Sequence, residues 1–180
     1  MTDQIKAIIH QYWKKEIDRN EFVKKIQAEI GGKKEDFRDL FQQIIQSKNQ
    51  DELELGLAIL YAVEENNDLI DLIHQLILEP WHREYEELAH DLQRRKQPES
   101  VPFLKEAMQK KYDYLESYGT GTRQFINQCG HALRSIGTEA AIEAIRTLSQ
   151  SDDPVIKDEM RYRLSQIEGR NDYQRNLNDD

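Results

Sequence analysis

Three side chains between residues 82 and 90 have types and spacing that could hold a metal ion. His82, Glu86 and His90 stand at positions i, i+4 and i+8, which share one face of a helix. Positions i and i+8 of a helix are about 12 Å apart along its axis, so both histidines cannot bind one ion directly. We therefore expect solvent-facing or interface polar residues here and no metal centre.

The single cysteine is the next candidate, as a nucleophile. Cys129 shares a helical face with Ile126 and Leu133, which predicts a small buried residue. His131 lies two positions further on and points elsewhere, so the local spacing makes no Cys–His pair. The Gly-Thr-Gly-Thr segment 119–122 lacks the preceding strand and the Lys-Ser/Thr ending of a phosphate-binding loop. We expect no catalytic or cofactor-binding residues, and hence no enzyme.

Residues 110–122 gather side chains that suit protein binding. Tyr112, Tyr114 and Tyr118 lie within seven residues, and Arg123 follows this segment directly. Tyrosine adds contact area at a low cost in conformational entropy and is enriched in interfaces. We predict that these four residues contact a partner protein. The alternative is that the tyrosines pack against their own domain.

The net charge of −9 is concentrated in the middle of the chain. Residues 1–48 carry a net charge of +2 and residues 109–180 carry −2, whereas residues 49–108 carry −9. A field of one sign accelerates association with an oppositely charged protein. We predict that Glu84, Glu86, Glu87 and Asp91 oppose the basic residues of a partner. The alternative is a set of solvated helix faces.

Composition excludes several classes of protein. The longest apolar run, residues 57–63, is too short to span a membrane, and the N-terminus lacks the features of a secretion signal. One cysteine in 180 residues excludes a disulfide framework and a Cys-based zinc site. Net acidity argues against a nucleic-acid backbone as the main partner. We expect a cytoplasmic protein that binds neither membranes nor nucleic acids.

Helices must position these candidate residues, because apolar residues recur with a helical period over nearly the whole chain. Asp18 with Glu21 resembles a capping box, and Asp153-Pro154 is typical of a helix start. Asn66-Asn67 and Gly137 are helix-ending signals. The pattern predicts an all-α chain with helices over about residues 5–13, 18–30, 37–45, 49–65, 68–78, 82–95, 99–112, 122–136, 139–150 and 153–168.

An internal repeat of about 31 residues links the later helices. Its leucine anchors are separated by 32, 41 and 31 residues, and the longer interval contains the segment 110–122; the anchors are Leu60, Leu92, Leu133 and Leu164. Each helix pair has an apolar stripe that it cannot bury alone, so neighbouring pairs stack into a curved array. A helical bundle with accidental periodicity is the alternative.

The segment CGHALRSIGTEAAIEAIRTLSQSDDPVIKDEMRYRLSQI resembles HEAT repeats. In this family a first helix ends in Ala-Leu, a Gly turn leads into a second helix with paired apolar residues, and Asp-Pro opens the next unit. The matching positions are Ala132, Leu133, Gly137, Ala140, Ile142, Ile145, Leu148, Asp153, Pro154 and Val155. The unit before it, residues 82–108, departs from the pattern because its turn has no Gly.

The resemblance implies a right-handed α-solenoid of HEAT-like helix pairs. We expect a helical N-terminal cap over 1–48, repeats over 49–168 with an insertion at about 110–122, and a flexible tail over 169–180. The chain is also similar to small bacterial HEAT-like proteins that act as immunity partners of polymorphic toxins. That likeness implies a non-enzymatic protein that neutralises a basic toxin domain by direct binding. The alternatives are a HEAT-like lyase, DNA glycosylase or ligand-binding protein, and an adaptor in a larger assembly.

Overall fold

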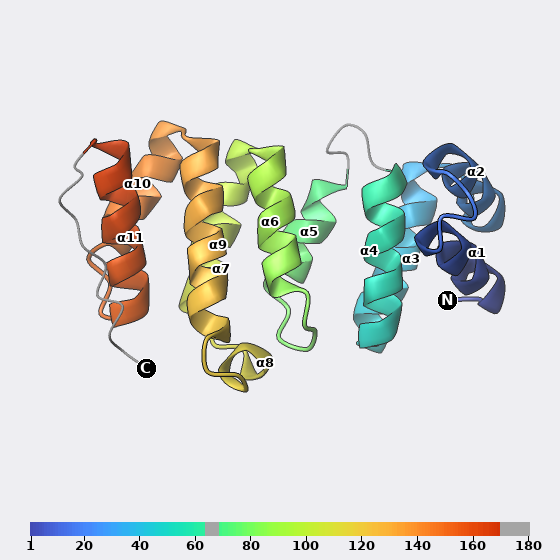
Figure 1. Ribbon diagram of the computed structural model, residues 1–180, viewed down its shortest axis with the longest axis horizontal. Helices are drawn as coiled ribbons and strands as arrows, with labels where there is room; N and C mark the ends of the chain where they lie inside the picture. The colour runs from blue at the N-terminus through green and yellow to red at the C-terminus, as the bar shows by residue number, and fades with distance from the viewer. Residues whose placement is uncertain (64–68, 170–180) are drawn as a thin grey trace. The chain divides into compact units, whose positions relative to one another are not determined.

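The computed structural model describes residues 1–63 and 69–169, and these residues form helices and no strands (Figure 1). The all-α prediction is therefore confirmed for the described chain. A single turn of 3-10 helix, Pro98–Ser100, precedes the seventh helix. The helices are α1 (Asp3–Trp13), α2 (Arg19–Ile30), α3 (Lys34–Ser47), α4 (Gln50–Val63), α5 (Ile70–Leu76), α6 (Tyr85–Arg95), α7 (Val101–Gln109), α8 (Asp113–Glu116), α9 (Gly121–Ile136), α10 (Glu139–Leu148) and α11 (Pro154–Ile167).

Capping side chains begin several of these helices where the sequence predicts. The Asp18 carboxylate accepts a hydrogen bond from the Glu21 N–H at 2.8 Å, and Asp153 accepts from the first turn of α11. Gly137 ends α9 with a φ of 67°, a left-handed conformation that favours glycine. The predicted helix end at Asn66-Asn67 and nearly all of the predicted tail lie outside the described residues.

Unit 1, Met1–Leu76, is a compact group built from α1 to α5. Its core is apolar and is contributed by all five helices, including Ile9, Phe22, Phe41, Leu60 and Ile73, each of them fully buried. Polar contacts also join distant parts of the unit: for example, Arg19 donates to the Ala62 carbonyl at 3.0 Å, and Arg38 pairs with Asp71. The predicted border between residues 48 and 49 thus falls inside unit 1.

Unit 2, Ile77–Asp180, contains α6 to α11. Helix α9 contacts both α6 and α11, and the three run side by side in Figure 1, while α7 and α10 contact each other and form a second layer. The short helix α8 lies against α9 at one edge of the unit. In unit 2, α6, α9 and α11 therefore form one layer, and α7 and α10 form the other.

The buried residues of unit 2 follow the repeat only in part. The anchors Leu92 and Leu133 are fully buried, whereas Leu164 is half-buried because α11 has no second helix of its own in the described chain. Helix α7 ends at Gln109, earlier than predicted, and the insertion adds the extra helix α8. No helix in the described ranges combines the length and the apolarity needed to cross a membrane.

Candidate protein-binding surface

The insertion is anchored to unit 2 by its first tyrosine. The Tyr112 side chain is 2% exposed, and its phenol donates a 2.9 Å hydrogen bond to the Ile77 carbonyl. Its ring lies 4.2 Å from the Tyr85 ring and 5.7 Å from the Phe125 ring. Tyr112 is thus a packing residue, and its prediction as an exposed partner contact is corrected: its aromatic neighbours lie well away in sequence and bury it.

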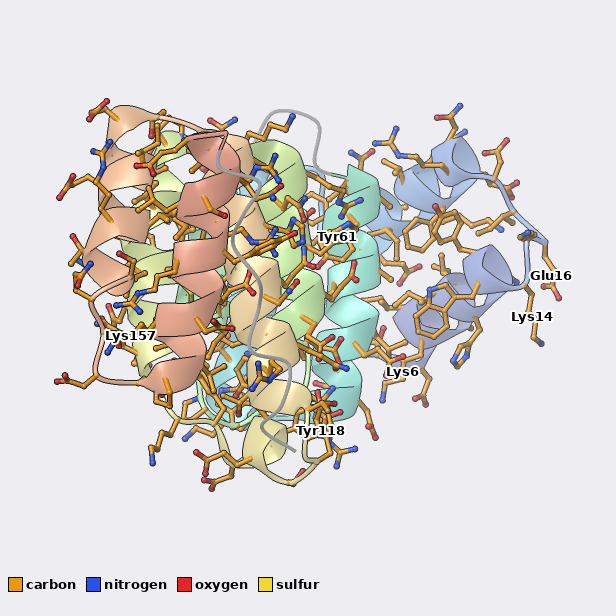
Figure 2. The ribbon with its side chains drawn as sticks, turned by 60° about the vertical axis from the view of Figure 1, so that its left-hand side comes forward. Lys6, Lys14, Glu16, Tyr61, Tyr118 and Lys157 are labelled. Carbon is orange, nitrogen blue, oxygen red and sulfur yellow. The ribbon has the colours of Figure 1, made fainter. Side chains whose placement is uncertain are left out.

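The other two tyrosines meet α6 at the surface. Tyr114 and Tyr118 are both half-buried and pack edge to face, with ring centres 5.3 Å apart. The Arg83 guanidinium lies over the Tyr114 ring at 5.6 Å, and the Tyr118 phenol donates to the Glu86 carboxylate at 3.0 Å. We call these four residues, Arg83, Glu86, Tyr114 and Tyr118, the tyrosine edge. Figure 2 marks Tyr118 beside the yellow ribbon of α8.

A close backbone approach fixes the end of the insertion. A Cβ atom added at Gly121 would lie 2.5 Å from the Leu115 carbonyl oxygen and 2.6 Å from the Tyr118 ring. Only glycine permits this distance between the start of α9 and the insertion. Glycine at this position therefore leaves room for the Tyr118 ring, which the hydrogen bond to Glu86 holds beside α6.

The phenols in this region keep their protons. Burial, the hydrogen bond to Glu86 and the negative charge of that residue raise the pKa of Tyr118 to about 12. Burial also raises the pKa of Tyr85 and of Tyr112 well above the usual range. At neutral pH the Tyr118 phenol is therefore a donor, and Glu86 is the acceptor.

The predicted acidic residues divide into surface and interior groups. Glu87 is exposed, and Glu84 and Glu86 are half-buried at the start of α6. Asp91 is 3% exposed and accepts from Arg94 at 2.7 Å and from Arg95 at 2.5 Å. The prediction that Asp91 faces a partner is therefore corrected, because its charge is already matched by arginines of the same helix.

The remaining predicted contact, Arg123, lies in the first turn of α9 and is half-buried. It lies three residues after Thr120, the N-cap residue of that helix. The structure thus brings Glu86 and Tyr118 into direct contact, while Asp91 and Tyr112 lie in the interior.

Two of the histidine and cysteine candidates, His82 and Cys129, occupy packed positions. His82 precedes α6, is 1% exposed, and stacks on Tyr85 with ring centres 4.4 Å apart, whereas His90 is exposed. Among the residues that the structure describes, no group of three His, Cys, Asp or Glu side chains could hold a metal ion. Cys129 is fully buried, and burial raises the pKa of its thiol far above the usual range. It is therefore a core residue, as the sequence predicts.

A buried charge pair on α11, at the face that contacts α9, was not predicted from the sequence. Glu159 and Arg163 are 6% and 2% exposed, and the Arg163 Nε donates to the Glu159 carboxylate at 2.5 Å. Asn127 also donates to Glu159, at 3.4 Å, and Arg163 lies 3.4 Å from the His131 Nδ1. Burial lowers the pKa of Arg163 to about 10, so the guanidinium stays charged at neutral pH. The Glu-x-x-x-Arg spacing in α11 is the signal that indicates such a pair.

A groove opens in unit 2 beside the insertion, on the side of α10 and α11. Its volume is about 530 Å³, and its walls are the last residues of α7, the insertion, the start of α9, and the turn between α10 and α11. Volumes of this size are typical of sites that bind small molecules or side chains. The groove and the tyrosine edge are thus the two surface features that the insertion creates.

Comparisons with known proteins identify no relative. No protein-family model, no curated protein and no solved structure matches the chain.

Proposed function

We propose that this chain is a non-enzymatic protein-binding module of HEAT-like helix pairs, and that the tyrosine edge is part of its contact surface. The observation that carries the proposal is the set of contacts Arg83–Tyr114–Tyr118–Glu86. These contacts hold two half-buried aromatic rings at the surface, and Glu87, the residue after Glu86, is exposed. Rigid aromatic side chains next to polar groups are typical of protein-binding sites.

The helix arrangement of unit 2 supports the HEAT-like part of the proposal. Helices α6 and α7 are followed by α9 and α10, and equivalent helices of the two pairs lie in the same layer. A right-handed solenoid formed by such pairs presents insertions along one edge, where partners often bind. The insertion 110–122 occupies that place between the two pairs.

The more specific form of the proposal is an immunity-type protein of the bacterial cytoplasm. It would neutralise a toxin domain by direct binding, with Glu84, Glu86 and Glu87 opposing basic residues of the toxin. The sequence resemblance to small HEAT-like immunity proteins and the acidity of residues 49–108 support this form. In such a complex the charges would raise the association rate, and the tyrosines would supply buried contact area.

The test begins with the protein encoded beside this chain's gene as the candidate partner. Binding of the purified pair is measured by biolayer interferometry at several salt concentrations. The variant Glu84→Lys/Glu87→Lys should associate more slowly and with a weaker dependence on salt, because two attractive charges become repulsive. Glu86 stays unchanged, since it holds Tyr118 in place.

A second variant tests the aromatic contact. Tyr114→Ala should raise the dissociation rate by roughly 10- to 30-fold, the effect expected for an interface aromatic worth about 2 kcal/mol. The matched control for charge is Glu139→Lys/Glu143→Lys on α10, whose two acids are exposed. Equal effects of the control and the α6 variant would contradict the proposed surface, and unaltered binding by Tyr114→Ala would remove the tyrosines from it.

A further inference from the structure

A positive charge already lies on one ring of the tyrosine edge. The guanidinium carbon of Arg83 is 5.6 Å from the centre of the Tyr114 ring, over its face. The face of an aromatic ring carries partial negative charge and attracts a cation. The Arg83 side chain is exposed, so this contact is made at the surface and not in the core. The edge therefore shows one chemical group that its ring accepts, a guanidinium.

The two tyrosine rings have other contacts that keep them in place. Tyr118 donates to Glu86 at 3.0 Å, and its ring meets the Tyr114 ring with centres 5.3 Å apart and planes at 62°. Gly121 leaves room for the Tyr118 ring. Both rings are half-buried, so each retains surface that a partner can reach. If Arg83 moved away, a formed aromatic surface would therefore remain.

Arg83 is the single basic residue of a long acidic segment. Residues 51–91 contain twelve Asp and Glu residues but only one Lys or Arg, which is Arg83. Three of these acids follow it within four positions, at the start of α6: Glu84, Glu86 and Glu87. The surroundings of the Tyr114 ring thus favour a cation, and the chain itself supplies one.

We infer that the tyrosine edge receives an arginine of the partner protein, and that Arg83 occupies the place of this arginine in the free chain. In the complex the partner's guanidinium would lie on the Tyr114 ring, and the Arg83 side chain would turn away from it. Arginine suits the ring better than lysine, because its planar guanidinium stacks on aromatic faces and is more weakly hydrated than an ammonium group. Arg83 is then an internal competitor that lowers the affinity for the partner.

This inference rests on the proposed function and adds the chemical group that is bound and a residue that tunes its binding. Replacing Arg83 would free the Tyr114 ring and would also remove a positive charge that repels a basic partner. Binding should therefore become tighter when Arg83 is replaced. A residue that only supplied contact area to the partner would have the opposite effect, so the sign of the change decides between the two roles.

The test uses the full chain with ¹³C-labelled tyrosine rings and a short peptide probe. The ring signals of Tyr114 and Tyr118 are followed by NMR during titration with acetyl-Gly-Arg-Gly-amide. A second peptide has citrulline in place of arginine, which keeps the shape and removes the charge. The arginine peptide should shift the Tyr114 signals. The variant Arg83→Gln should bind this peptide roughly two- to fivefold more tightly, the effect of one exposed cation–π contact.

Two further variants separate the ring contact from net charge. Arg146→Gln is the matched control, because it removes the same charge from an exposed position on α10, outside the tyrosine edge. It should leave the affinity for the arginine peptide unchanged. Tyr114→Leu should abolish the difference between the two peptides, since leucine has no ring face. Arg83 and Arg146 are both exposed, so their variants are expected to fold.

Each other outcome overturns the inference. Unchanged or weaker binding by Arg83→Gln would show that Arg83 does not compete, and an equal gain in Arg146→Gln would leave only an effect of net charge. Equal binding of the two peptides by Arg83→Gln, or no shift of the Tyr114 signals, would remove the arginine site. The outcome is separable from that of the proposed function. If the peptide results hold but the candidate partner does not bind the chain, the proposed function fails alone; if the partner binds at the edge and Arg83→Gln weakens that complex, the inference fails alone.

Discussion

The Tyr112 phenol donates its hydrogen bond to the carbonyl of Ile77, 35 residues earlier in the chain. Ile77 is the first residue of unit 2, so one side chain of the insertion is joined to the segment that precedes α6. The same ring packs between Tyr85 of α6 and Phe125 of α9. The insertion is consequently part of the core of unit 2.

Removing only the Tyr112 hydroxyl should remove one buried hydrogen bond and leave the ring in place. We predict that Tyr112→Phe lowers the free energy of unfolding by about 1 kcal/mol, because the buried Ile77 carbonyl loses its donor. Tyr112→Ala should lower it by about 3–5 kcal/mol, since an aromatic ring leaves the core. Urea denaturation followed by circular dichroism measures both values. Tyr114→Phe, at a half-buried position, is the control and should have almost no effect; an equally small effect of Tyr112→Phe would contradict the prediction.

Helix α11 packs closely on α9 at Gly130. A Cβ atom at Gly130 would lie 2.8 Å from the Met160 methyl group and 3.2 Å from the Glu159 carboxylate. We predict that Gly130→Ala lowers the free energy of unfolding by about 1–3 kcal/mol through overpacking, even though alanine favours helix. Gly119→Ala is the matched control, because nothing lies within 4 Å of its Cβ. Similar unfolding midpoints for the two variants would show that the contact relaxes without cost.

Removing only one charge of the buried pair Glu159–Arg163 should strongly lower the free energy of unfolding. We predict that Arg163→Met destabilises the chain by about 3–5 kcal/mol, because it leaves the Glu159 carboxylate buried without its cation. The double variant Glu159→Leu/Arg163→Met should recover most of this loss, since no buried charge remains. The exposed pair Glu143–Arg146 is the control. Breaking this pair should lower the free energy of unfolding by at most about 1 kcal/mol. A double variant as unstable as the single one would contradict this account.

The raised pKa of Tyr118 predicts a dependence of stability on alkaline pH. The pKa is about 12 in the folded chain, against about 10 for an unfolded tyrosine. The folded state therefore holds this proton more tightly, so its contribution is complete below the unfolded pKa and is lost as the pH rises through the folded one. Unfolding free energies of the parent chain and of Tyr118→Phe should converge over this range. A difference that stays constant with pH would contradict the shift.

The helical period and the capping residues predicted most of the secondary structure, because those signals are local. Asp18, Asp153 and Gly137 act within one turn of their own helices, and their roles are confirmed. The burial of Tyr112 depends on Ile77 and Tyr85, which are far away in the sequence and leave no local pattern. The predicted surface therefore included Tyr112, which the tertiary structure buries.

The prediction that Asp91 faces a partner was wrong for a different reason. Its partners Arg94 and Arg95 lie three and four residues later on the same helix, so the pairing is readable from the sequence. The net charge of residues 49–108 includes these arginines but does not show which acids they neutralise. The groove, in contrast, depends on the spacing between helix ends of two successive pairs, and residue types alone do not fix that spacing.

The anchoring of the insertion has a consequence for the kinetics of any complex at the tyrosine edge. A flexible loop loses conformational entropy when a partner orders it, and this loss weakens the complex and slows its formation. Here Tyr112 and the close approach at Gly121 order the loop during folding, before a partner arrives. A partner that binds this edge should consequently meet a preorganised surface, and the two should associate as rigid bodies.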